Sequence, residues 1–188
     1  MCIRVHPWLK ILWFALSVSA TVNAAEIRAV DVDGRERVLN GSGRVHVVIY
    51  SNEEVQDATR AASRALDELQ GVRAFRSVIV VDLRGSLAHL APGYAQRRMM
   101  RDLDAEAERL TPFYRNNGNG GDPRADLSVV ADFKGELAAR LGWRESAATL
   151  RVLVFDQAGR EAARWEDLRD YARLRKTVGQ LLGKPSHE

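Results

Sequence analysis

The sequence predicts one α/β domain, in which helices flank a mixed central sheet, a β-hairpin precedes the sheet and a helical insertion interrupts it. Two patterns predict this class. Short runs rich in β-branched residues are typical of buried strands, and they recur at residues 45–50, 77–82, 127–131 and 149–155. The segments between these runs carry apolar residues three and four apart, which is typical of amphipathic helices. Strands separated by helices favour parallel pairing through right-handed crossovers.

The N-terminal part of the domain is predicted to begin with the hairpin. An Asp-Gly dipeptide within residues 29–39 is suited to a tight turn between two short strands. After the first buried strand, the apolar spacing predicts a helix over residues 53–69. Ser51 or Asn52 can cap that helix, and capping is the role that we expect of Ser51.

The remaining elements are predicted from the same periodicities and from turn residues. An insertion helix is expected over residues 93–114, followed by an exposed loop over 115–124 that is the best candidate for disorder. A short helix over 134–141 is expected next, capped by Asp132. A strand over 161–165 should pair with the preceding strand as a hairpin, and a last helix should cover 166–182.

Residues 1–24 have the three parts of a secretory signal peptide. Arg4 and Lys10 charge its front, a run of 12 uncharged residues follows, and small side chains precede the expected cleavage site near Ala24. An uncleaved membrane anchor is the alternative, but the run is shorter than the ~20 residues that span a bilayer. We therefore expect a periplasmic or secreted protein, no stable membrane span after cleavage, and a single domain over residues 25–188.

The composition argues against several classes of function. The formal net charge is +3, and it falls further when Arg4 and Lys10 leave with the leader, so no basic field favours nucleic acid. The only cysteine is Cys2, which also lies in the leader. No pair of the four histidines has metal-ligand spacing, and His46 is expected to be a core or sheet-face residue. We expect no metal and no cofactor.

Three stretches of the chain carry a family resemblance: VDVDGRERVL at residues 30–39, LSVVADFKGELAARLGW at 127–143 and LRVLVFDQAGRE at 150–161. In this order they are similar to the opening hairpin, the strand-aspartate-helix unit and the late hairpin of the thioredoxin-like superfamily, in its peroxiredoxin and TlpA-like branch. The resemblance covers most of residues 27–182, and the nearest look-alike is the YtfJ-type family of periplasmic proteins.

The chain departs from that superfamily at both places where its redox members do chemistry. Those members place a Cys-x-x-Cys pair or a lone peroxidatic cysteine just after the first central strand, and a cis-proline before the late strand. In this sequence the degenerate redox position consists of Ser51, Asn52, Glu53, Val55 and Gln56, together with Ala147 and Ala148 where proline is expected. The resemblance therefore implies a scaffold without thiol chemistry.

Four charged residues form a candidate ligand rim. Asp82 and Asp132 are both expected at the C-terminal ends of parallel strands, the edge at which open α/β sheets bind ligands. Arg84 and Lys134 follow them closely in the sequence. The alternative is that Asp132 caps a helix and that the other three are solvated loop charges.

The insertion helix supplies a candidate partner surface. Its large apolar side chains could form an adaptable apolar surface, and they are Tyr94, Met99, Met100, Phe113 and Tyr114. The alternative is that these side chains belong to the core. A stripe of Met100, Leu103 and Leu110 also offers a route to self-assembly, and the oligomeric state stays open.

The leading hypothesis is an exported thioredoxin-fold protein without redox activity that binds a protein or peptide partner in the cell envelope. The motivating observation is a preserved scaffold whose thiol and proline positions are both replaced. The runner-up is a thiol-independent enzyme or small-molecule-binding protein that uses the rim of Asp82 and Asp132. The sequence leaves the identity of the partner open.

Overall fold

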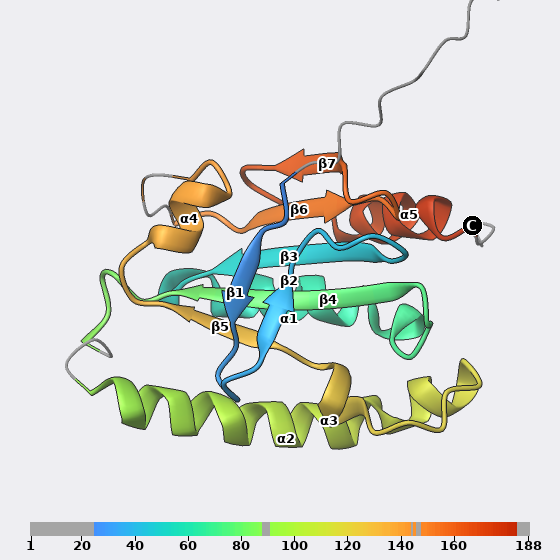
Figure 1. The fold of residues 1–188 in the computed structure, drawn as a ribbon, viewed down its shortest axis with the longest axis horizontal. Coiled ribbons are helices and arrows are strands. Elements are labelled where there is room, and N and C mark those ends of the chain that lie inside the picture. The colour runs from blue at the N-terminus through green and yellow to red at the C-terminus, as the bar shows by residue number, and fades with distance from the viewer. Residues whose placement is uncertain (1–24, 88–90, 144, 146–147, 184–188) are drawn as a thin grey trace, which may run out of the picture.

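The computed structural model describes residues 25–87, 91–143, 145 and 148–183. Its centre is a five-stranded sheet with the order β5-β4-β3-β6-β7, and a separate two-stranded hairpin lies across one face (Figure 1). The strands are β1 (Arg28–Val30), β2 (Glu36–Val38), β3 (Val45–Ser51), β4 (Phe75–Asp82), β5 (Val129–Asp132), β6 (Arg151–Phe155) and β7 (Glu161–Trp165). The predicted α/β class with an N-terminal hairpin is confirmed.

The helices cover both faces and one edge of this sheet. They are η1 (Glu53–Val55), α1 (Gln56–Arg64), η2 (Asp67–Leu69), α2 (Pro92–Asn116), α3 (Pro123–Asp126), α4 (Glu136–Arg140) and α5 (Tyr171–Leu181). Helices α1 and α5 lie behind the sheet in the view of Figure 1, α4 and the hairpin lie in front, and α2 runs along the β5 edge. The predicted insertion helix is therefore present as α2.

The pairing of the strands is parallel on one side of β3 and antiparallel on the other. β3, β4 and β5 pair in parallel, and β6 and β7 form the predicted antiparallel hairpin. The expectation that strands separated by helices pair in parallel fails for β6, which is antiparallel to β3. The reason is that α4 is too short to carry the chain back along the sheet, so β6 starts at the end where β5 stops (Figure 1).

β3 is the centre of the fold because all of its residues are buried. Alternate side chains of a strand point to opposite faces, so β3 supplies two cores at once. Val47 and Ile49 pack with α1 and α5 in a first core. Val48 and Tyr50 pack with α4 and the hairpin in a second core.

A third core fixes α2 to the sheet edge. Leu103, Ala107 and Leu110 of α2 are buried against Val129 of β5, and Ile79 of β4 packs on the same cluster. The spacing of the three α2 residues is that of one helix face, which is the reason the sequence pattern located this helix correctly. α2 therefore forms a rigid wall beside β4 and β5.

Three predicted helices are shorter than expected, and the one predicted over residues 134–141 spans only Glu136–Arg140. The helix predicted over residues 53–69 is split into η1, α1 and η2, and the chain leaves α-helical geometry after Arg64 so that Leu66 and Leu69 both reach the first core. The last helix begins only at Tyr171, where Asp170 accepts a hydrogen bond from the Arg173 N–H at 2.9 Å.

The segment over residues 115–124, predicted to be an exposed loop and a candidate for disorder, is held by side-chain amides. Asn117 Nδ2 donates to the carbonyl of Gln70 at 2.7 Å, and Asn119 Nδ2 donates to the carbonyl of Gly71 at 3.1 Å. α3 begins within this segment, at Pro123. These contacts tie the end of α2 to the turn before β4.

The predicted signal peptide, residues 1–24, lies outside the described residues. Among the helices of the described part of the chain, none combines the length and the apolar character needed to cross a membrane.

We expect Gly71→Ala to lower the free energy of unfolding by about 3 kcal/mol, because two costs combine at this position. Gly71 has a φ of +84°, and an added Cβ would lie 2.7 Å from the Cα of Tyr114. Gly43 has the same φ of +84° with no atom within 4 Å, so Gly43→Ala is the matched control. The control should lose only about 1 kcal/mol in urea unfolding. Equal losses would show that the Tyr114 contact carries no cost.

We also expect the stability to fall in mild acid because of His46. This side chain is buried, as predicted, and burial together with the charges of Arg76 and Arg44 lowers its pKa to about 4. The unfolded chain binds a proton near pH 6.5 and the folded chain does not, so the stabilisation is complete above that pH and is lost toward pH 4. Unfolding curves should show about 2 kcal/mol less stability at pH 5 than at pH 7 from this group. His46→Gln should remove that difference.

Candidate functional site

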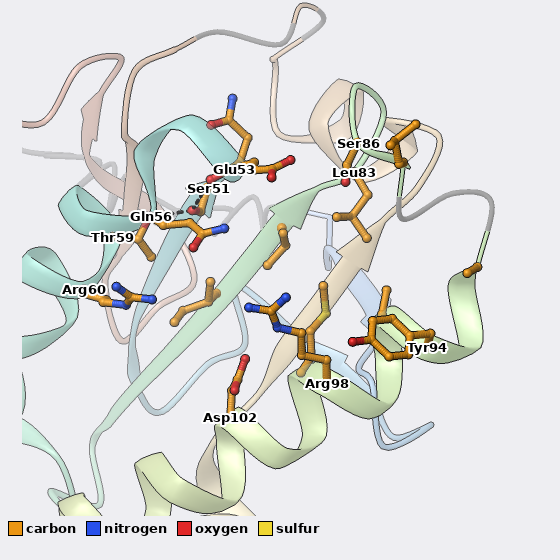
Figure 2. A pocket seen from close by; sticks show the side chains of 17 residues that line it. Ser51, Glu53, Gln56, Thr59, Arg60, Leu83, Ser86, Tyr94, Arg98 and Asp102 are labelled. Carbon is orange, nitrogen blue, oxygen red and sulfur yellow. Dashed lines mark hydrogen bonds between the residues drawn. The ribbon is translucent and has the colours of Figure 1, made fainter.

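A cavity of about 490 Å³ opens where β3 ends and α1 begins, opposite the N-terminal half of α2 (Figure 2). It lies on the α1 side of the sheet, and its floor is β4. Ile79 and Val81 alternate along the end of that strand, so their side chains point to the same face, and Leu83, the residue after the strand, continues the row. The floor is thus an apolar row that runs parallel to β4 between two helical walls.

We call this cavity the β4 groove. Its mouth carries two unusually exposed apolar side chains. Leu87 is 79% exposed and Tyr94 is 58% exposed, and both line the groove. Among the described residues, one other large apolar side chain is comparably exposed, Val30 of the hairpin at 62%. Exposed apolar side chains gathered beside a cavity are typical of binding surfaces.

The wall formed by the turn from β3 into α1 contains the degenerate redox position. Asn52, Glu53 and Gln56 line the groove on this side, with Arg60 one turn further along α1. Asn52 caps η1, since its Oδ1 accepts hydrogen bonds from the N–H groups of Glu54 and Val55 at 3.0 and 3.2 Å. Val55 is buried in the first core.

The expectation that Ser51 caps the helix is wrong, because Asn52 is the cap. Ser51 is the last residue of β3 and is buried. Its Oγ lies 2.6 Å from the Oγ1 of Thr59, which itself lies 2.9 Å from the carbonyl oxygen of Val55. The Ser51 Oγ also lies 3.3 Å from the carbonyl oxygen of Asn52, so either hydroxyl can be the donor in the contact between Ser51 and Thr59. Ser51 thus joins β3 to α1.

The second half of the degenerate redox position is described only at Ala148. Ala147 falls outside the described residues, and Ala148 is exposed and does not line the groove. The insertion helix forms the wall opposite Asn52 and Glu53.

The structure places the candidate rim on the other face of the sheet. Asp82 and Asp132 are paired in register at the ends of β4 and β5, as predicted. The Asp82 side chain is 1% exposed, and Arg84 binds both of its oxygens, with Nε–Oδ1 and Nη2–Oδ2 distances of 2.9 and 2.7 Å. Tyr50 packs beside this pair, and burial raises the pKa of its hydroxyl. None of the rim residues lines the groove.

Asp132 and Lys134 complete the rim but differ in environment. Asp132 is buried, and its Oδ2 accepts a hydrogen bond from the Ala138 N–H of α4 at 2.8 Å. It therefore supports the short helix, close to the capping role predicted for it. Lys134 is exposed.

The candidate partner surface on α2 divides between the groove and the core. Tyr94 and Met99 line the groove. Met100 and Phe113 pack on the third core, and Tyr114 is buried there, with its hydroxyl 3.3 Å from Asp126. Leu103 and Leu110, the rest of the predicted self-assembly stripe, are also buried in that core.

Several lining residues were not found from the sequence. Arg60 on α1 and Arg98 and Asp102 on α2 face the groove, although each looks like an ordinary charged position on a helix surface. Their place in the groove depends on tertiary structure, because it requires α1 and α2 to lie on either side of β4. Within the described residues, no cluster of three or more histidine, cysteine or acidic side chains is arranged to hold a metal ion.

We expect Asp82→Asn to lower the free energy of unfolding by about 2 kcal/mol, because it leaves Arg84 facing a neutral amide in a buried position. The matched control is Asp57→Asn, whose parent side chain is 99% exposed and also pairs with an arginine. An exposed pair contributes little, so the control should change stability by less than about 0.5 kcal/mol. Equal effects in thermal unfolding would contradict a structural role for Asp82.

Comparisons with known proteins establish the fold of this chain and no closer relationship. No protein-family model matches the chain, and no curated protein matches it by sequence. Among solved structures, an exposed lipoprotein thioredoxin from Streptococcus pneumoniae is similar, with a TM-score of 0.52, 16% identity and coverage of 83% of this chain and 99% of that chain.

Two further solved structures are similar to the same extent. A secreted thiol-disulfide isomerase from Corynebacterium glutamicum has a TM-score of 0.55 at 14% identity, covering 85% of this chain and 84% of that one. A DsbF homologue from Corynebacterium diphtheriae has a TM-score of 0.50 at 18% identity, covering 82% and 83%. With a single cysteine in its sequence, this chain has a thioredoxin-like fold that lacks the Cys-x-x-Cys redox pair.

Proposed function

We propose that this chain is an exported thioredoxin-fold protein without redox activity that binds a protein or peptide partner in the cell envelope through the β4 groove. The observation that carries the proposal is the position of Leu87 and Tyr94, exposed by 79% and 58%, at the mouth of a cavity beside the turn where redox relatives carry their thiol. A single apolar side chain on a surface is ordinary, but two beside one cavity favour recognition.

The chemistry of the groove supports binding more than catalysis. Ser51, whose hydroxyl stands where the thiol is missing, is buried, and its Oγ lies 2.6 Å from the Thr59 Oγ1. A serine nucleophile needs a base within hydrogen-bond reach, and none of the described residues that line the groove is a histidine. The lining instead combines an apolar floor with a few polar side chains, as binding sites commonly do.

The cellular setting is part of the proposal. The expected signal peptide favours export, and the solved structures described above are of an exposed lipoprotein and a secreted protein. The narrower resemblance to YtfJ-type periplasmic proteins fits the same setting. We therefore place the partner in the periplasm or at the outer face of the cytoplasmic membrane.

The charged rim supports the alternative of a thiol-independent enzyme or small-molecule binder less well. Asp82 is buried and held by Arg84, and Asp132 supports α4. A ligand there would have to displace these contacts, whereas the groove is already open.

A photo-crosslinking amino acid at the groove mouth tests the proposal in cells. Placed at Tyr94, it should give one discrete adduct in the envelope fraction, and the adduct should disappear when Leu87→Asp is added. The matched control is Val30, whose side chain is 62% exposed on the hairpin and lies outside the groove. Adducts of equal yield at both positions would contradict a specific site.

The same preparation tests the absence of redox chemistry. The protein recovered from the envelope should show no thiol titration and no disulfide reductase or thiol peroxidase turnover, because Cys2 lies in the expected leader. Robust turnover in either assay would overturn the proposal.

A further inference from the structure

We infer that the β4 groove receives the C-terminal end of a peptide, with an apolar side chain on the floor and the terminal carboxylate between Arg60 and Arg98. This inference rests on the proposed partner-binding function and adds the chemistry of the partner. It follows from the order of charges along the groove and from the apolar floor beneath them.

The charged residues are ordered from the mouth of the groove inward. α1 and α2 both run back along β4 from its C-terminal end, so successive turns of the two helices face each other across the floor (Figure 2). Glu53 stands near the mouth. Arg60 and Arg98 lie deeper, on opposite walls, and both extend toward the space between the helices (Figure 2).

The pair of guanidinium groups provides the charge that a carboxylate needs. Arg60 Nη1 lies 3.1 Å from Asp57, a pair whose side chains are 66% and 99% exposed, so water screens it and a ligand can compete for Arg60. Within the described part of the chain, no ion pair or hydrogen bond joins the Arg98 side chain to another residue. Asp102 lies one turn deeper on α2 and lines the same space, so it opposes an anion placed beyond Arg98. The carboxylate position is thereby confined to the space between the two arginines.

Beyond the inner end of the groove, an ion-pair network joins α2 to η2. Arg109 Nη2 donates to Asp67 at 2.7 Å and to Glu106 at 2.7 Å. None of these three residues lines the groove, whose lining on α2 ends at Asp102, and Arg109 lies about three turns beyond Arg98. A chain end, which carries the carboxylate that the two arginines attract, fits this space better than an internal segment.

The direction of the peptide follows from the same charges. Glu53 at the mouth repels a carboxylate, whereas Arg60 and Arg98 attract one, so the carboxylate is drawn to the inner end. The last side chain would then lie over Ile79 and Val81. Because an extended peptide places alternate side chains on one face, the third-last side chain would lie near Leu83 and Leu87 at the mouth.

A fluorescent peptide pool tests this inference on the exported protein. The probe consists of labelled pentapeptides with Leu, Ile, Val or Phe at the last and third-last positions and Ser elsewhere, prepared as free acids and as C-terminal amides. Fluorescence anisotropy should show that the free acids bind about tenfold more tightly than the amides, as expected for a charge-assisted contact with arginine. Tyr94→Ala should weaken both forms.

Substitution of the arginine separates the carboxylate contact from the apolar contact. Arg98→Gln should remove the preference for the free acid and leave amide binding unchanged, and Arg98→Lys should keep part of the preference. Arg101→Gln is the matched control, because Arg101 is an exposed arginine on α2 that does not line the groove. Its binding should equal that of the unchanged protein.

Four outcomes would overturn the inference. They are equal affinity for acids and amides, equal effects of Arg98→Gln and Arg101→Gln, no binding of the pool, and equal binding of an amidated peptide that carries an internal Asp beside its apolar residue. Binding of decanoate without binding of peptides would assign the groove to a lipid chain instead. The Tyr94 crosslink tests the partner-binding function separately, so that function can stand when the carboxylate preference fails.

Discussion

The complete burial of β3 is the constraint on which the rest of the structure depends. A strand that is buried on both faces must have helices or other strands on each side, and β3 meets this need with α1 and α5 behind it and with α4 and the hairpin in front. Its two neighbours, β4 and β6, complete its backbone hydrogen bonds in opposite senses, one parallel and one antiparallel. The mixed sheet, the two cores and the position of the groove all follow from this arrangement.

The groove exists because α2 packs on the edge of the sheet and not on its centre. Leu103, Ala107 and Leu110 hold the middle of α2 against β5 and β4, whereas α1 is held by the first core on β3. The two helices therefore stand apart over the end of β4, and Ile79 and Val81 remain only partly covered between them. A binding surface arises here from the spacing of two cores, without a loop built for the purpose.

The sequence predicted the strands and the insertion helix well because each depends on a local pattern of burial. The β-branched runs match β3, β4 and β6 closely, and the three- and four-residue spacing of Leu103, Ala107 and Leu110 located α2. The direction of β6 was not predicted, because periodicity carries no information about which end of the sheet a chain re-enters. The break after Arg64 was missed for a related reason, since the packing of Leu66 and Leu69 overrides helix propensity there.

The candidate site was predicted only in part, because the groove is formed by segments that the sequence alone does not bring together. Ser51, Asn52, Glu53, Gln56, Tyr94 and Met99 were named from the sequence and line the groove. Other residues named from the sequence, Asp82 and Asp132 of the rim and the distal aromatic Tyr114, are buried in structural contacts. Arg60 and Arg98 gave no signal, because a solvated arginine and one that faces a groove look identical until the opposite wall is known.

The buried hydroxyl pair of Ser51 and Thr59 has a consequence for how easily thiol chemistry could return to this scaffold. A cysteine introduced at Ser51 would sit at the end of a fully buried strand, against the Thr59 hydroxyl 2.6 Å from the present oxygen. Burial disfavours the thiolate, and the thiolate is the reactive form. A single codon change would thus restore a sulfur atom without restoring a nucleophile. Redox activity would return only if the turn from β3 into α1 also changed and exposed the thiol.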